Sequence, residues 1–341
     1  MPTGVGNSSF MLSLRLHKTV FVFFINTLLF SWCNSFAFAQ EELNVSDSNE
    51  TFEKNGICYR TLNQSEVEVV MSPRTAYSGT LKIPASIKYN GKNYVVSAIG
   101  DYAFSGCDSL KEINLPHSVR QFGEGAFWKT PQLKRINIDK GKTRLFTENG
   151  ILYKGTTLIT AYNPDLNCVV KAGTSTIASY ALCGNNSELL SVVLPESVDT
   201  ILASAFQEQT SLDTIILSDN VKFIGDRAFQ GCSLLRNIRI PDQVRHIGYF
   251  CFYDCTGLRN VHLGKNVEEI GEGVFYDCIS LRAIYCHCPT PPSMLHIENG
   301  VFYFSNESET IEVYIPKNSE TKYRNSCDWK EFHLTFSATI K

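Results

Sequence analysis

The stretch IGDRAFQGCSLLRNIRIPDQVRH, residues 224–246, decides the fold because its opening phrase returns at a fixed step. Ile-Gly-x-x-x-Phe starts at Ile224, Ile247 and Ile270, each 23 residues after the one before. A constant period of this size is typical of a solenoid, in which each repeat is one coil that packs only on its neighbours. Further copies, some of them degenerate, start at Ile99, Phe122, Ile177 and Ile201.

Each coil ends in a short apolar alternation that predicts a β-strand with one buried face. In the coil quoted above, the alternation runs through Leu235, Ile238 and Ile240 and stops at Pro241, which cannot donate to a strand ladder. We therefore expect one short parallel strand per coil of about 23 residues, with irregular or short helical turns on the other side of the coil.

The phenylalanine of the phrase falls at the same place in successive coils, so these rings should stack inside the solenoid. Burying each ring stabilises the fold by about 1.5–3 kcal/mol relative to leaving it exposed. The predicted internal column consists of Phe104, Phe127, Phe206, Phe229, Phe252 and Phe275.

The extended pattern Ile-Gly-x-x-x-Phe-x-x-Cys-x-x-Leu-x-x-Ile-x-Ile-Pro resembles the BspA-like leucine-rich repeat family. The flanking segments are similar to that family too: Gly56–Gly100 to its N-terminal cap, Asn149–Pro164 to its longer hairpin coil, and Ile311–Phe332 to its C-terminal cap. The resemblance implies a leucine-rich-repeat solenoid with caps at both ends. It also implies a protein of the bacterial surface that binds host matrix proteins such as fibronectin, or other bacteria.

Combining the repeat with this resemblance gives a predicted order of segments along the chain. They are a signal peptide (1–39), a flexible acidic leader (40–55), an N-terminal β cap (56–98), the solenoid (99–296) with an irregular longer coil at about 143–176, and the last coil with the C-terminal cap (297–341).

The first 39 residues have the three parts of a secretory signal. Basic Arg15 and Lys18 precede an apolar run over residues 20–30, and Ala37-Phe38-Ala39 forms an A-x-A cleavage site. The apolar run is too short for a membrane span, and we expect none in the mature chain. A lipoprotein anchor at Cys33 is the alternative, but the bulky Trp32 fits such a site badly.

The charge balance disfavours nucleic acid as a partner. The whole chain has a net charge of −3, and removing residues 1–39 leaves 29 basic and 34 acidic residues, a net charge of −5. A general nucleic-acid binder would favour a basic surface.

Exported proteins often use cysteines as disulfides, but the spacing here predicts another role. Cys107, Cys232, Cys255 and Cys278 each follow the first residue of their phrase by eight positions. In-register stacking points their Cβ atoms the same way, which is unfavourable for disulfide geometry. We expect a column of buried free thiols that donate weakly to nearby backbone.

Metal, cofactor and catalytic sites have little support in the sequence. Cys286-His287-Cys288 has the residue types of a zinc site, but Cys286 occupies an inward slot and no second ligand pair has zinc-like spacing. The chain has no G-x-S-x-G, H-E-x-x-H or P-loop motif. We therefore expect no metal, no cofactor and no enzymatic activity.

The outward strand positions give the one candidate site. Six coils place five basic residues and Asp213 in the column just after the buried leucine: Lys111, Lys134, Asp213, Arg236, Arg259 and Arg282. The densest candidate partner-binding patch is Arg236, Arg239, Arg259, His262, Arg282 and Tyr285. Arginine and tyrosine are enriched at binding hot spots. The alternative is that basic residues only keep an exposed strand soluble and unpaired.

These observations predict an exported, non-enzymatic protein at the cell surface or outside the cell, used for adhesion or protein–protein binding. An extracellular-matrix or cell-surface protein is the expected partner, and an acidic glycan would also suit the basic column. An envelope or periplasmic scaffold is the second hypothesis, and a glycan-binding module or an enzyme is the third.

Overall fold

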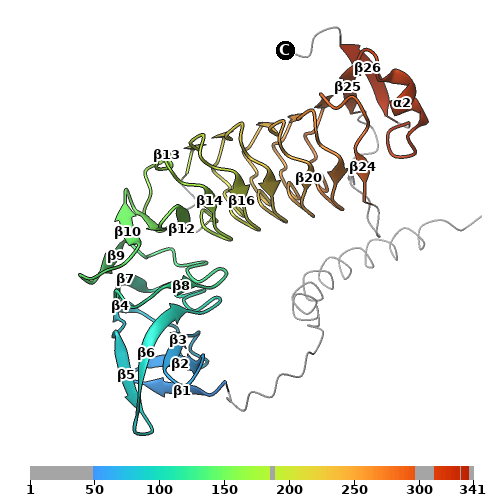
Figure 1. The fold of residues 1–341 in the computed structure, drawn as a ribbon. Coiled ribbons are helices and arrows are strands. Elements are labelled where there is room, and N and C mark those ends of the chain that lie inside the picture. Colours follow the sequence, from blue (N-terminus) through green and yellow to red (C-terminus); the bar gives the residue numbers. More distant parts are fainter. Residues whose placement is uncertain (1–48, 185–188, 296–310, 331, 338–341) are drawn as a thin grey trace, which may run out of the picture. The chain divides into compact units, whose positions relative to one another are not determined.

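The computed structural model describes residues 49–184, 189–295, 311–330 and 332–337, which form one compact unit. The predicted signal peptide, its alternative Cys33 and most of the predicted leader lie outside the described residues. Along this unit the chain turns repeatedly through similar coils (Figure 1). Within it, no helix is long and apolar enough to cross a membrane.

An N-terminal cap of five strands opens the unit. Its sheet has the order β1 (Thr51–Lys54), β2 (Ile57–Thr61), β3 (Glu66–Val69), β6 (Lys92–Ile99) and β5 (Ser86–Tyr89), and β8 (Gln121–Phe122) extends β6 into the coils.

The cap starts before the predicted boundary at residue 56. β1 pairs antiparallel with β2, and Phe52 is buried and stacks on Tyr89 at 3.7 Å between ring centroids. A single apolar residue in a polar segment leaves no periodic signal, so the sequence assigned residues 51–54 to the leader.

The predicted strand of each coil is present, and these strands form the front ladder. It consists of three sheets. They are β4 (Gly79–Lys82), β7 (Leu110–Leu115) and β9 (Arg135–Ile138); then β13 (Asn167–Val169), β15 (Ser191–Val193) and β17 (Thr214–Ile216); then β19 (Asn237–Arg239), β21 (Asn260–Leu263), β23 (Ala283–Cys286), β25 (Glu312–Pro316) and β26 (His333–Ser337).

The coils also carry a second, short strand, which in the coils that start at Ile177, Ile201, Ile224, Ile247 and Ile270 has two residues and ends on the first residue of the phrase. These strands form the back ladder, whose order is β10 (Leu145–Glu148), β11 (Ile151–Lys154), β12 (Thr157–Ala161), β14 (Thr176–Ile177), β16 (Thr200–Ile201), β18 (Phe223–Ile224), β20 (His246–Ile247), β22 (Glu269–Ile270) and β24 (Ser293–Met294). The leucine-rich-repeat solenoid is confirmed. The additional strand was not predicted, because two residues with one buried side chain are too short to alternate.

The phenylalanine column lies in the core, as predicted. Phe206, Phe229, Phe252 and Phe275 are completely buried and stack with centroid distances of 5.0, 5.3 and 5.9 Å. Their planes lie within 6° of parallel. Each ring therefore fills the space beneath the next, and the coils depend on one another for burial.

The cysteine column is also confirmed as buried free thiols. The Sγ atoms of Cys232, Cys255 and Cys278 donate to the carbonyl oxygens of Phe206, Phe229 and Phe252 in the preceding coil, at 3.2, 3.1 and 3.0 Å. Burial raises the pKa of Cys232 to about 12. The thiols thus join neighbouring coils without covalent bonds.

Where the column lacks cysteine, another donor takes the slot. Thr130 donates to the carbonyl oxygen of Phe127, and the Nε2 atom of Gln209 donates to that of Leu182 at 2.6 Å. Both side chains are buried. The slot therefore accepts other hydrogen-bond donors in place of the thiol.

The glycine of the phrase is explained by the close approach of successive coils. A Cβ atom on Gly248 would lie 2.5 Å from the backbone nitrogen of Asp226, and one on Gly225 would lie 2.7 Å from that of Ala203. Real Cβ atoms do not approach this closely. Glycine is needed here because a side chain would collide with the backbone of the preceding coil, and not because the backbone adopts a positive φ.

Two residues later in the phrase the backbone does become left-handed, at Arg227 and Phe250 among others, with φ of 55° and 54°. In this turn the backbone N–H groups point toward the next coil and donate hydrogen bonds to it. Arg227 and Phe229 donate to the carbonyl oxygens of Tyr249 and Cys251 at 2.8 and 2.9 Å. The turns therefore bond coil to coil, as the strands do.

The predicted irregular coil at about 143–176 contains a three-stranded antiparallel meander, with β11 paired to β10 and to β12. Only β12 then continues the parallel back ladder, through Leu158 opposite Ile177. At the other end, helix α2 (Glu320–Asn325) buries Tyr323, and the indole of Trp329 donates to the carbonyl oxygen of Pro292 at 2.7 Å. These contacts cover the last described coil.

Candidate partner-binding face

The outward side chains of the front ladder between β19 and β26 form the candidate face. Strand register places Arg239, His262, Tyr285 and Tyr314 opposite one another on successive strands. The inward neighbours, such as Ile238 and Val261, are buried. Alternation in a strand thus turns one column to the core and the next to solvent.

Three of these outward side chains form a stack of rings. The His262 and Tyr285 centroids are 4.3 Å apart with planes 9° from parallel, and Tyr285 and Tyr314 are 4.7 Å apart at 10°. His287 lies beside them, 5.8 Å from His262. The three rings are half-buried against one another, so their orientation is already restricted before any partner binds.

The arginine column runs alongside these rings. The Arg259 N–H donates to the carbonyl oxygen of Arg236, and the Arg282 N–H donates to that of Arg259, at 2.8 and 2.9 Å. All three side chains are exposed. Arg236 lies 3.7 Å from Asp213, so its charge is partly balanced.

Arg239, the fourth arginine of the candidate patch, forms an exposed ion pair with Asp219 at 2.5 Å. The positive charge of the face comes from arginine rather than histidine. Burial lowers the pKa of His262, as do its neighbours His287 and Arg239. Burial is also the main cause that lowers the pKa of His287.

All six predicted patch residues lie on this one face, within three consecutive coils. The long basic column is not continuous, however. Backbone hydrogen bonds from Leu190 to Leu166 and from Asp213 to Leu190 insert two leucines between Lys134 and Asp213. The count of six coils omitted the coils that start at Leu158 and Ile177, which lie in and next to the irregular coil.

The structure adds an aliphatic section that sequence reasoning missed. Val169, Val193 and Ile216 are aligned on β13, β15 and β17, in the column that later holds Arg239 and His262. Val169 is 68% exposed and Ile216 is 55% exposed, which is unusual for side chains of this kind. Leu166 and Leu190 flank the same section. The doublet Val192-Val193, which breaks the apolar–polar alternation, was the available signal.

Tyr314 on β25 is the second outward residue that the sequence did not reveal. The 23-residue period is lost in the residues before this strand. The pair beside it, His333 Nδ1 and Glu312 Oε2, lies at 2.7 Å, and hydrogen bonding by His333 and Thr335 lowers the pKa of Glu312.

The Cys286-His287-Cys288 segment is built into the core and the cap. Cys286 and Cys288 are buried, and the hydroxyl of Tyr323 donates to the carbonyl oxygen of Cys288 at 3.1 Å. Burial raises the pKa of both thiols, that of Cys288 to about 12. Among the described residues, no group of three or more His, Cys, Asp or Glu side chains is arranged to hold a metal ion.

Comparison with known proteins identifies the repeat. A family model described as "BspA type Leucine rich repeat region" matches residues 76–160 and 175–309, in six copies. The chain belongs to this family. The gap between the two matched ranges falls within the irregular coil.

Several solved structures of leucine-rich repeat proteins are similar to the chain. A leucine rich cell surface protein from Faecalibacterium prausnitzii shares 18% identity over 71% of this chain and 96% of its own, with a TM-score of 0.43. The pneumococcal vaccine antigen PcpA shares 15% over 85% and 99%, with a TM-score of 0.48. A protein from Eubacterium ventriosum shares 16% over 73% and 91%, with a TM-score of 0.47. The search of curated proteins returned no match.

Proposed function

We propose that this protein is an exported, non-enzymatic bacterial surface protein that binds an acidic protein partner through the arginine–tyrosine face. The observation that carries the proposal is the alignment of the arginine column with the stacked rings on one exposed sheet. Membership in the BspA-type family and the predicted signal peptide support a location outside the cytoplasm.

The face has the physical properties of a binding surface. Tyrosine and arginine supply large contact area and directed hydrogen bonds, and they are enriched where interfaces derive most of their affinity. Because Tyr285 is stacked on both sides, binding would cost little further side-chain entropy. Exposed Arg259 and Arg282 would attract carboxylates and increase the association rate.

The partner we expect is an extracellular-matrix or cell-surface protein with an acidic surface, as the family resemblance implies. A sulfated or carboxylated glycan presents the same charge and is the second candidate ligand. Both would bind more weakly as salt concentration rises, because exposed charges are screened.

The test is a triple charge reversal, Arg236→Glu, Arg259→Glu and Arg282→Glu. We expect binding to immobilised matrix proteins to fall at least about tenfold, since each exposed ion pair contributes roughly 0.2–1 kcal/mol and reversal adds repulsion. The matched control is Lys111→Glu, Lys134→Glu and Arg135→Glu, which makes the same change of charge elsewhere on the front ladder.

Equal binding by both triple variants, with unchanged melting curves, would contradict the assignment of the arginine–tyrosine face as the binding surface. Protease treatment of intact cells addresses the location. A surface protein should be cleaved, whereas a periplasmic scaffold would survive until the envelope is opened.

A further inference from the structure

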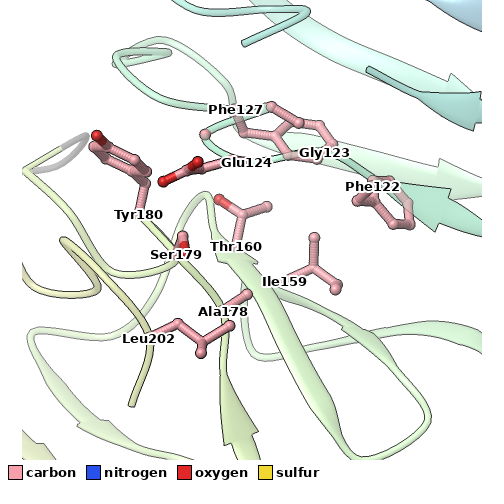
Figure 2. Close-up of a pocket in the computed structure, with 12 residues that line it drawn as sticks. Phe122, Gly123, Glu124, Phe127, Ile159, Thr160, Ala178, Ser179, Tyr180 and Leu202 are labelled. Atoms are coloured by element: carbon pink, nitrogen blue, oxygen red, sulfur yellow. The ribbon is translucent and has the colours of Figure 1, made fainter. Parts of the chain in front are cut away.

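A pocket lies where the irregular coil interrupts the stack, far along the chain from the arginine column. It encloses about 210 Å³ and is lined by the turn at residues 122–127, by Ile159 and Thr160 of β12, and by residues 178–180 with Leu202 (Figure 2). Four successive coils, which start at Phe122, Leu158, Ile177 and Ile201, thus contribute its walls.

The pocket exists because one coil lacks its phenylalanine turn. In the coil that starts at Ile201, twelve residues lead to Asp213 in the front ladder, but only eight lead from Leu158 to the equivalent Leu166. The missing turn would have supplied the next ring after Phe127. The glycine slot is filled by Ile159 instead, and the following coils have Ala178 and Leu202 there. The pocket therefore follows from the residues that this shortened coil lacks.

Its lining is divided into a polar end and an apolar end. Figure 2 shows Glu124, Thr160 and Tyr180 gathered toward one end, and Phe122 and Ile159 at the other. A small ligand with an aliphatic body and one polar head matches this division.

The hydroxyl of Thr160 is the clearest sign of an occupant. Thr160 is only 2% exposed, and its Oγ1 atom has no hydrogen-bond partner in the described part of the chain. An unsatisfied buried hydroxyl costs stability. A ligand head that hydrogen-bonds to Oγ1 would remove that cost.

The charges around the polar end select the sign of the head group. Asp101 accepts a hydrogen bond from the backbone N–H of Glu124 at 2.7 Å, and its negative charge acts on the Glu124 carboxyl group. Partial burial, followed by the charge of Asp101, raises the pKa of Glu124. The nearby cation Lys129 is held over Trp128 at 4.6 Å and lies 3.6 Å from Glu208. A positive ligand would relieve the repulsion between the carboxylates, whereas an anion would add to it.

Aromatic rings adjoin the same end. Tyr180 is 5.3 Å from Trp128 and 5.8 Å from Tyr102, centroid to centroid. Electron-rich ring faces attract cations, including alkylammonium groups.

We propose that this pocket binds a primary alkylammonium group, with the ammonium head between Glu124 and Thr160 and the aliphatic body against Phe122 and Ile159. The volume suits about eight non-hydrogen atoms, by comparison with a cavity of about 150 Å³ that holds benzene. A free amine and the lysine side chain of a partner protein share this chemistry. The site is separate from the arginine–tyrosine face.

Three probes of matched length test the head group on the purified chain by calorimetry: n-hexylamine, 1-hexanol and hexanoate. We expect hexylamine to bind most tightly and hexanoate not to bind. Nα-acetyl-lysine amide distinguishes the sources: binding tighter than hexylamine indicates a partner's lysine, and weaker binding indicates a free amine.

Glu124→Gln should weaken hexylamine about three- to tenfold, as expected for one partly exposed ion pair, and leave 1-hexanol unchanged. Thr160→Val, which keeps the shape, should weaken both. Ala178→Leu should abolish binding by filling the space, and Glu53→Gln on exposed β1 is the matched control.

Equal affinity for hexylamine and 1-hexanol, or an unchanged hexylamine affinity in Glu124→Gln, would overturn the ammonium assignment. Failure of all the probes to bind the unmodified chain would overturn the site itself. Neither result bears on binding through the arginines, so the two proposals fail independently.

Discussion

The regular coils from Ile201 to Met294 and the irregular coil at 143–176 use the same ladders but fill their interiors differently. In the coils that start at Ile224, Ile247 and Ile270, a ring and a thiol from each turn occupy the core, and glycine lets the backbones approach. In the irregular coil the turn is shortened and the phenylalanine of the phrase is absent, so the buried rings there are Tyr153 and Tyr162 and a pocket remains beside the turn at residues 122–127. Regular repetition therefore fills the core, and its interruption leaves a pocket.

The two regions also differ on the outer face. Regular coils present Arg236, Arg259 and Arg282, whereas the irregular coil and its neighbour present Leu166, Leu190 and exposed valine. The inward positions follow packing rules, while the outward positions are free to vary. Folding therefore does not dictate the differences between coils on this face.

The largest effect that separates the two regions should come from the phenylalanine column. Phe252→Ala leaves a cavity between two stacked rings and should destabilise the protein by about 3–5 kcal/mol. Phe146→Ala, in the meander, removes a ring that is only partly buried against Tyr153 and should cost about half as much. Thermal melting of both variants measures the difference. A Phe252→Ala melting temperature within about a degree of the parent would contradict the stacking that this column shows.

A smaller effect should come from the glycine slot. Gly248→Ala forces a methyl group against the backbone of Asp226 and should cost about 1–3 kcal/mol, a typical penalty for overpacking. Leu202→Ala, at the equivalent slot beside the pocket, removes apolar contact without any such clash. We expect the urea midpoint to fall further for Gly248→Ala. The reverse order would mean that the coils at Gly248 are not closely packed.

The smallest and most local effect should appear in thiol reactivity. Exposed Cys327 should react first with iodoacetamide, and Cys168 of the irregular coil should react before Cys255. Burial raises the pKa of Cys168 to about 11 and raises that of Cys255 well above its usual value, so both are protonated at pH 8 and their surroundings must open before they react. Raising the pH toward 10 should accelerate Cys168 more than Cys255. Mass spectrometry of tryptic peptides follows each site, and equal rates at Cys168 and Cys255 would show that the interruption does not weaken the stack.

The interior of the regular coils could be predicted from sequence because each slot repeats. Phe229 and Cys232 could be placed by counting 23 residues, and both lie where the count put them. The back ladder was missed, since a two-residue strand such as β18 buries one side chain and gives no alternation. Tertiary stacking, not local propensity, creates that strand.

The candidate site was harder to predict than the fold. Arg259 and Tyr285 were found because their coils keep the register. Val169 and Tyr314 were missed because shortened or lost phrases precede them. The pocket at Thr160 depends on residues that are absent from a turn, and a missing segment leaves no motif to recognise. Sequence periodicity thus predicts what repeats and overlooks what departs from it.

The constant step from Ile201 to Ile270 also has an evolutionary consequence. Because each turn bonds only to the turn before and after it, removing or duplicating one block of 23 residues would join surfaces that already match. Unequal recombination within this segment could lengthen or shorten the row of arginines while both caps stay unchanged. The length of the proposed binding surface can therefore change in steps of one coil, by copying, without new contacts between coils having to arise.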